Sequence, residues 1–168
     1  MIEITKDNFM DQAYPVFRKF SRQLAVLTAG TMESFNAMTI GWGMLGNVWG
    51  HAPGITVYVS PSRYTQRFME KYGYFTVCFF DESHHADVMT LGTISGRDGD
   101  KIARTSLTPK ALPQGVGFAE AELTLVCRKV YGAQFNVDKL PAFTLDMYKR
   151  FEPHYEYIGV IEDAFGLL

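Results

Sequence analysis

Runs of β-branched and aromatic residues follow one another along this chain without helices between them at regular intervals. Residues 55–60 read Ile-Thr-Val-Tyr-Val-Ser, a composition typical of strands. Similar runs predict further strands at residues 23–31, 35–42, 74–80, 118–131 and 155–165. Regular strand–helix alternation would indicate a parallel doubly wound sheet, so its absence favours an antiparallel one. About six such strands with aromatic faces suggest a small barrel, since closure removes exposed edges.

Helices are expected in only a few places. Residues 66–72 carry apolar side chains three and four positions apart, which gives one helical face, and Gly73 then stands where a C-cap would. Residues 81–93 predict a second helix, and residues 95–101 predict a loop that leads into a short helix at 102–105. The predicted fold class is therefore mostly β and antiparallel, with a helix inserted after the third or fourth strand.

Size and charge limit the class of protein. The 168 residues suit one domain spanning residues 1–168, and 47% hydrophobic with 20% charged residues is ordinary globular usage. A net charge of −2 argues against a nucleic-acid or anionic-membrane surface. The N-terminus lacks the pattern of a signal peptide, and no apolar run approaches the ~20 residues of a membrane helix. We expect a cytoplasmic protein without nucleic-acid or membrane partners.

The cysteines and histidines give no metal-binding pattern. Cys78 and Cys127 are far apart and each lies in an apolar run, so we expect buried free thiols in a reducing compartment. His84 and His85 are adjacent and would diverge on a helix, and the other two histidines are isolated. We therefore predict no metal site.

The segment Gly41-Trp-Gly-Met-Leu-Gly46 matches the dinucleotide motif G-x-G-x-x-G letter for letter. That motif must run from a strand into a helix, so that helix N–H groups meet the pyrophosphate. Here residues 47–54 contain two glycines and a proline, and residues 60–67, near the expected ribose position, contain no acid. We interpret the segment as a glycine-rich strand and turn whose backbone passes close to something flat.

Residues 60–65, Ser-Pro-Ser-Arg-Tyr-Thr, join a predicted strand to a predicted helix. A helix N-terminus presents unpaired N–H groups and partial positive charge. Ser62 and Thr65 add hydroxyl groups, and Arg63 adds a planar guanidinium suited to phosphate. Taken alone, these residues allow two interpretations. They form a phosphate cradle, or Ser62 or Thr65 merely caps the helix while Arg63 is solvated.

Read together with this segment, Asn36-Ala-Met-Thr-Ile-Gly-Trp42 resembles the flavin reductase-like proteins, including the flavoredoxins, whose fold is an FMN-binding split barrel. The similar pattern is Asn-x-Met-Thr-x-x-Trp, then a strand ending in Pro-Ser-Arg-x-Thr, then a helix. Three further segments are similar to the family: Gly73–Val77, Ser95–Lys101 and His154–Val160. The resemblance spans about residues 20–165. One departure is Cys78, where the family often has Asn. Whether this chain makes the family's polar contact near the cofactor at that position is therefore left open.

The resemblance implies a split β-barrel that holds a noncovalent FMN near the interface of a homodimer. Residues 38–42 would line the flavin ring, partly through the main chain, and the 60–65 segment would hold the ribityl phosphate. The cofactor-binding residues that it implies are Asn36, Met38, Thr39, Ile40, Gly41, Trp42, Ser60, Pro61, Ser62, Arg63, Thr65 and Cys78. It would also account for Gly41 and Gly43, because a Cβ would intrude on a ring lying against the backbone.

The function implied is that of an NAD(P)H-dependent flavin oxidoreductase, which moves electrons through FMN to an acceptor. No side chain need act as acid or base in the hydride step, and the single catalytic candidate, by family analogy, is His154. Two alternatives stay open. The chain could be an FMN-binding electron carrier without its own nicotinamide site, or a split-barrel module that binds something other than a flavin, such as haem, or nothing.

Overall fold

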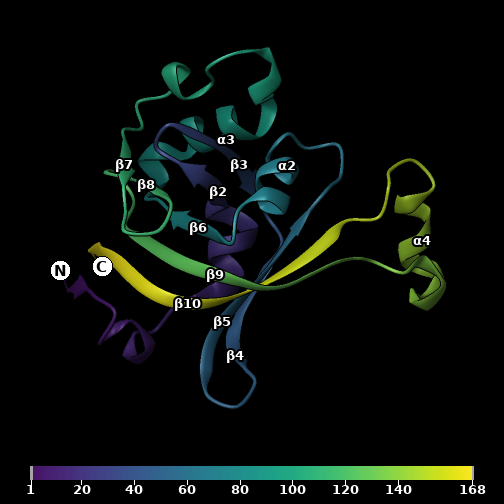
Figure 1. Ribbon diagram of the computed structural model, residues 1–168, viewed down its shortest axis with the longest axis horizontal. Helices are drawn as coiled ribbons and strands as arrows, with labels where there is room; N and C mark the ends of the chain where they lie inside the picture. Colours follow the sequence, from purple (N-terminus) through teal and green to yellow (C-terminus); the bar gives the residue numbers. More distant parts are fainter. Residues whose placement is uncertain (1, 168) are drawn as a thin grey trace.

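One eight-stranded antiparallel sheet carries most of the fold (Figure 1). The computed structural model describes residues 2–167. The order across the sheet is β3-β2-β6-β9-β10-β5-β4, and β1 pairs with the end of β10. These strands are β1 (Glu3–Ile4), β2 (Ala25–Thr31), β3 (Ser34–Ile40), β4 (Gly43–Val48), β5 (Ala52–Val59), β6 (Tyr74–Phe79), β9 (Leu123–Gln134) and β10 (Tyr155–Leu167). A separate two-stranded sheet consists of β7 (Pro109–Ala111) and β8 (Val116–Phe118).

The helices are short. They are α1 (Val16–Arg18), which runs on into a π-helical turn at Lys19–Gln23, α2 (Thr65–Lys71), α3 (His85–Thr93) and α4 (Ala142–Tyr148). Further 3-10 turns include Glu82–His84 before α3 and, after it, Gly96–Asp98 and Ile102–Arg104. The predicted helices at 66–72 and 81–93 therefore correspond to α2 and α3.

The predicted fold class is confirmed, since the fold is mostly antiparallel β and α2 follows β5, which is the fourth strand when the two-residue β1 is left out. The expected closure of the barrel is wrong, because the sheet stays open with β3 and β4 at its two ends. The sequence also gave no indication of α4. Figure 1 shows this helix at the tip of a long ribbon, formed by the far ends of β9 and β10, that projects away from the rest of the sheet.

The central strands bury both faces, and their alternation divides the core in two. The larger cluster includes Phe75, Val77 and Phe79 of β6, together with Phe20 and Leu123. The intervening side chain of Cys78 belongs to a second cluster, as does Phe80 just beyond the strand. The period of two in a strand produces this division.

Both cysteines are free and fully buried, as the sequence predicted. Burial raises the pKa of the Cys78 thiol to about 11 and that of Cys127 well above its usual range, so neither thiol is reactive at neutral pH.

Helix α3 packs on β3 and so fixes the position of the next loop. The hydroxyl group of Thr39 in β3 donates a hydrogen bond to the carbonyl oxygen of Val88 in α3. Gly92 permits this approach, since a Cβ there would lie 3.0 Å from the Thr39 side chain. The C-terminal end of α3 thereby lies beside the segment that joins β5 to α2.

Candidate functional site

Two adjoining cavities lie where β3, β5 and the start of α2 meet. The first, which we call the aromatic cavity, has a volume of about 300 Å³. Its lining residues are Met38, Thr39, Ile40, Trp42, Tyr58, Ser60, Ser62, Arg63, Met147, Phe151 and His154. The second, the cationic cavity, has a volume of about 130 Å³. Its lining residues are Asn36, Met38, Ser62, Arg63, Tyr64, Thr65, Leu91, Ile94, Ser95, Gly96, Arg97 and Lys101.

The two cavities share Met38, Ser62 and Arg63, so a single ligand can extend from one into the other. A larger cavity of about 690 Å³ adjoins the cationic cavity on the side of the β2–β3 turn and has Glu33 and Asp100 in its lining. Lys101 lines both of these cavities, but within residues 2–167 the two arginines line only the smaller of them, which also lacks the acidic residues of the larger cavity.

Three cations and no carboxylate line the cationic cavity, in a chain whose net charge is −2. The guanidinium group of Arg63 donates to the carbonyl oxygen of Gly92 at 3.2 Å. That of Arg97 donates to the carbonyl oxygen of Ser62 at 3.0 Å. Guanidinium groups held in this way match the oxygen atoms of a phosphate. The arrangement therefore favours a dianionic ligand group.

Lys101 is the most deeply placed of the three cations, with 5% of its surface exposed. Its ammonium group donates to the carbonyl oxygens of Leu91 at 2.8 Å and Ile94 at 3.2 Å. Burial, together with the charge of Arg63, lowers the pKa of Lys101 to about 8. Lys101 therefore remains mainly charged at neutral pH, and a bound anion would stabilise that charge.

The segment before α2 forms the floor between the two cavities. The hydroxyl oxygens of Ser60 and Ser62 lie 2.9 Å apart, and the side-chain amide of Asn36 donates to the Thr65 hydroxyl oxygen at 2.6 Å. Helix α2 begins after Tyr64, and within residues 2–167 no side chain caps its first turn. The interpretation of Ser62 or Thr65 as a helix cap is therefore wrong. The full positive charges at the site are those of Arg63, Arg97 and Lys101.

Aromatic rings from three parts of the chain surround the aromatic cavity. The ring centroids of Trp42 and His154 lie 4.9 Å apart with 36° between their planes, and those of Trp42 and Tyr58 lie 6.3 Å apart. The Tyr148 hydroxyl lies 3.2 Å from Nδ1 of His154. Burial and the nearby charge of Arg63 lower the pKa of His154, so this imidazole is neutral at pH 7. The cavity suits a planar, largely apolar group.

The structure brings most of the predicted site residues together. The predicted residues that line the two cavities are Asn36, Met38, Thr39, Ile40, Trp42, Ser60, Ser62, Arg63, Thr65 and His154. Gly41, Pro61 and Cys78 line neither of them. Cys78 is fully buried in the second core cluster, where its sulfur lies 3.4 Å from the Thr124 hydroxyl oxygen. The structure therefore gives Cys78 a role in the core and no place in either cavity.

The structure supplies a reason for glycine at position 43 that the sequence did not suggest. A Cβ at Gly43 would lie 2.4 Å from two ring carbons of Phe20, and a Cβ at Gly41 would lie 3.3 Å from the side chain of Leu24. A ring of the core therefore lies against the backbone at Gly43, and contact of a flavin ring with this segment stays a prediction. The prediction that this segment does not lead into a helix is confirmed, because Gly43 and Gly46 lie within β4, which turns directly into β5.

The sequence prediction assigned no role to Ser95, Arg97 or Lys101, all of which line the cationic cavity. The signal was present, since two cations follow Ser95 within six residues in a loop after a predicted helix. Met147 and Phe151 were also missed, because they lie on and just after α4.

Within residues 2–167, no three histidine, cysteine, aspartate or glutamate side chains gather closely enough to hold a metal ion. In the same part of the chain, no helix has the length and apolar character needed to cross a membrane.

An open antiparallel sheet with these two joined cavities places the protein among the split-barrel proteins. The family model described as flavin reductase like domain matches residues 17–137, and the chain belongs to this family. This confirms the family that the sequence motifs indicated. No curated protein matches the sequence.

Solved structures show the same fold. The chain is similar to flavoredoxin from Methanosarcina acetivorans, at 24% identity and a TM-score of 0.67 over 86% of this chain and 68% of that one. An FMN-binding protein from Thermus thermophilus, crystallised with 1-cyclohex-2-enone, has 18% identity and a TM-score of 0.69 over 92% and 76%. Flavoredoxin of Desulfovibrio vulgaris (Miyazaki F) has 20% identity and a TM-score of 0.66 over 91% and 75%.

Proposed function

We propose that this chain binds FMN noncovalently and acts as a flavin-dependent oxidoreductase. The observation that carries the proposal is the junction of the two cavities at Ser62 and Arg63. FMN joins a planar tricyclic ring to a phosphate through a short flexible chain. A flat aromatic slot that opens into a pocket with three cations and no acid fits both ends of such a molecule.

Each of the two cavities would hold one end of FMN. Arg63, Arg97 and Lys101 would hold the phosphate, with the Ser62 hydroxyl as a further donor. Met38, Trp42 and His154 would hold the ring and exclude water from it. When bound, FMN supplies the electron-transfer chemistry that protein side chains lack.

His154 has a specific part in this proposal. Tyr148 holds the Nδ1 side of its imidazole, which leaves Nε2 as the other polar atom of the ring. Because the pKa of His154 is lowered, the ring packs on Trp42 without adding positive charge to the slot. We assign it to orienting the planar group, and a role in proton transfer would act through Nε2.

NAD(P)H as the electron donor, and a cytoplasmic location where it is abundant, are part of the same proposal. The competing function is that of an electron carrier, and it is favoured by the flavoredoxins among the similar structures. The two functions share the FMN site and differ in whether a nicotinamide nucleotide reduces the flavin directly.

The test uses purified full-length protein mixed with FMN, followed by visible absorbance and flavin fluorescence. We expect about one FMN per chain and FMN-dependent oxidation of NADH or NADPH in air. Binding of FMN without nicotinamide oxidation would refute direct reduction by NAD(P)H and support the electron-carrier function. Protein that binds no FMN, or that binds haem instead, would refute the proposal.

We also propose that the protein is a homodimer with the flavin near the subunit interface. Large aromatic side chains remain exposed on the single chain, among them Phe17 at 92%, Phe143 at 84% and Trp49 at 69%. Stable dimers bury ~2,000 Å² or more and favour such residues at their interfaces. Light scattering at micromolar concentration should give twice the mass of the 19.0 kDa chain. The mass of a single chain would contradict the proposal.

A further inference from the structure

The loop between α3 and β7, residues 94–108, carries two of the three cations of the cationic cavity. Within residues 2–167, the backbone hydrogen bonds inside residues 95–107 are local turns, such as those from Asp98 to Ser95 and from Thr105 to Ile102. No strand pairing holds this stretch to the sheet. The placement of Arg97 and Lys101 therefore depends on side chains that tie the loop to its neighbours.

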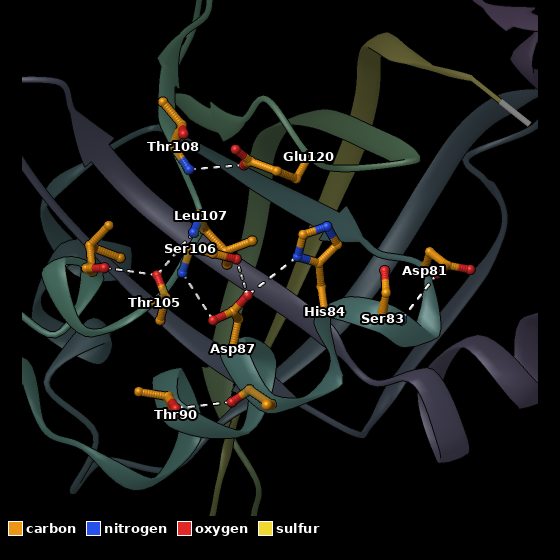
Figure 2. A network of polar contacts seen from close by, with 12 residues as sticks. Asp81, Ser83, His84, Asp87, Thr90, Thr105, Ser106, Leu107, Thr108 and Glu120 are labelled. Atoms are coloured by element: carbon orange, nitrogen blue, oxygen red, sulfur yellow. Dashed lines mark hydrogen bonds and ion pairs between the residues drawn. The ribbon is translucent and has the colours of Figure 1, made fainter.

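Asp87 of α3 provides such a tie, as Figure 2 shows. One of its carboxylate oxygens accepts a hydrogen bond from the Ser106 backbone N–H at 3.0 Å, and the other accepts one from the Ser106 hydroxyl at 2.6 Å. The second oxygen also lies 3.3 Å from Nδ1 of His84. Although burial alone would raise the pKa of Asp87, the hydrogen bonds from Ser106 and the contact with His84 lower it. The carboxylate is therefore charged at neutral pH, and both of its oxygens accept hydrogen bonds from Ser106 of the loop.

The same helix holds the cations at its other end. The carbonyl oxygen of Gly92 accepts from Arg63, and that of Leu91 accepts from Lys101. Helix α3 thus binds the loop near its end, through Ser106, and fixes two charged groups of the cavity one to two turns further along. A change at Asp87 can move the cations without touching a ligand.

Other contacts limit how far the loop could move. Leu107 is buried in the second core cluster, and Ile102 packs against that cluster. The backbone N–H of Thr108 donates to Glu120 at 2.8 Å. Loss of the Asp87 contact should therefore displace the cations slightly and leave the loop attached.

From this arrangement we infer that Asp87 and Ser106 are positioning residues for the phosphate group of the ligand, although neither lines the cationic cavity. The inference rests on the proposed binding of FMN. It goes beyond that proposal because it assigns the geometry of the phosphate pocket to a contact at the N-terminal end of α3, away from the pocket. Pre-organised donors lose binding energy when their supporting contacts are removed.

The experiment compares FMN with riboflavin, which has the same ring but no phosphate. Dissociation constants for both are measured by flavin fluorescence in wild-type protein and in the variants Asp87→Ala and Ser106→Ala. We expect the wild type to prefer FMN, and each variant to reduce that preference about threefold to tenfold while riboflavin affinity stays the same. Ser106→Thr keeps a hydroxyl and should restore most of the preference.

Thr90→Ala is the matched control, because the Thr90 hydroxyl of α3 donates to the helix carbonyl of Ala86 and, within residues 2–167, bonds to no atom of the loop. It should leave the preference unchanged. A general loss of stability would weaken both flavins alike and keep their ratio, so an unchanged ratio in Asp87→Ala and Ser106→Ala would overturn the inference while the FMN site stands. Equal affinity of the wild type for both flavins would instead refute the phosphate pocket, and the inference with it.

Discussion

Replacing Arg63 by alanine is expected to weaken FMN binding by about tenfold to a hundredfold. Arg63 lines both cavities and is held at the cationic one by its bond to the Gly92 carbonyl. Hydrogen bonds to charged groups contribute ~1.5–3 kcal/mol each, which corresponds to a change of that size in affinity. The measurement is a fluorescence titration of wild type and Arg63→Ala with FMN.

The chain offers a matched control for this variant. Arg67 lies one turn further along, in α2, with its guanidinium group 5.9 Å from the centre of the Tyr64 ring, and it lines neither cavity. Arg67→Ala removes the same charge from the protein and should change FMN affinity less than about twofold. If the two variants bind FMN equally well, Arg63 does not contact the phosphate. Riboflavin affinity should be nearly unaffected in both.

The sequence predicted the local parts of this fold well. Strand composition and apolar spacing located β5, β6 and α2, because those signals lie within a few residues of one another. The expected glycine cap is wrong: the C-cap of α2 is Tyr72, in an extended conformation, and Gly73 does not have a positive φ. Closure of the sheet and the ribbon that carries α4 were not predictable in this way. Whether β3 and β4 meet depends on the twist and length of strands far apart in the chain.

In the candidate site, too, the sequence predicted residues that belong to local motifs and missed those whose place depends on contacts between distant elements. Asn36 and Thr65 are 29 residues apart, and the family motifs placed both at the site, where the structure joins them by a hydrogen bond. The cations of the following loop had no assigned role, because their place depends on how α3 packs against β3. Cys78 was placed near the cofactor by its position in the motif, yet strand alternation turns its side chain into the second core cluster.

Phe20 is the residue that local reasoning could not connect to the glycine motif. It stands 23 positions before Gly43 in the sequence, and its ring fills the space where a side chain at Gly43 would lie. The ring is 4% exposed and packs edge-on against Phe79, with 5.4 Å between centroids. It therefore has little room to move aside.

Gly43→Ala is accordingly expected to destabilise the fold by about 1–3 kcal/mol, the usual cost of overpacking a core. Gly46→Ala, in the same strand and the same motif, should change stability by less than about 0.5 kcal/mol, since nothing lies within 4 Å of its Cβ position. Urea unfolding of the two variants measures the difference. A double variant with Phe20→Leu should recover part of the loss, because the smaller side chain vacates the position of the ring edge. Equal stabilities for Gly43→Ala and Gly46→Ala would show that Phe20 does not set the requirement for glycine at position 43. The identity of this residue would then have to come from a ligand beside the strand, as the sequence motif first suggested.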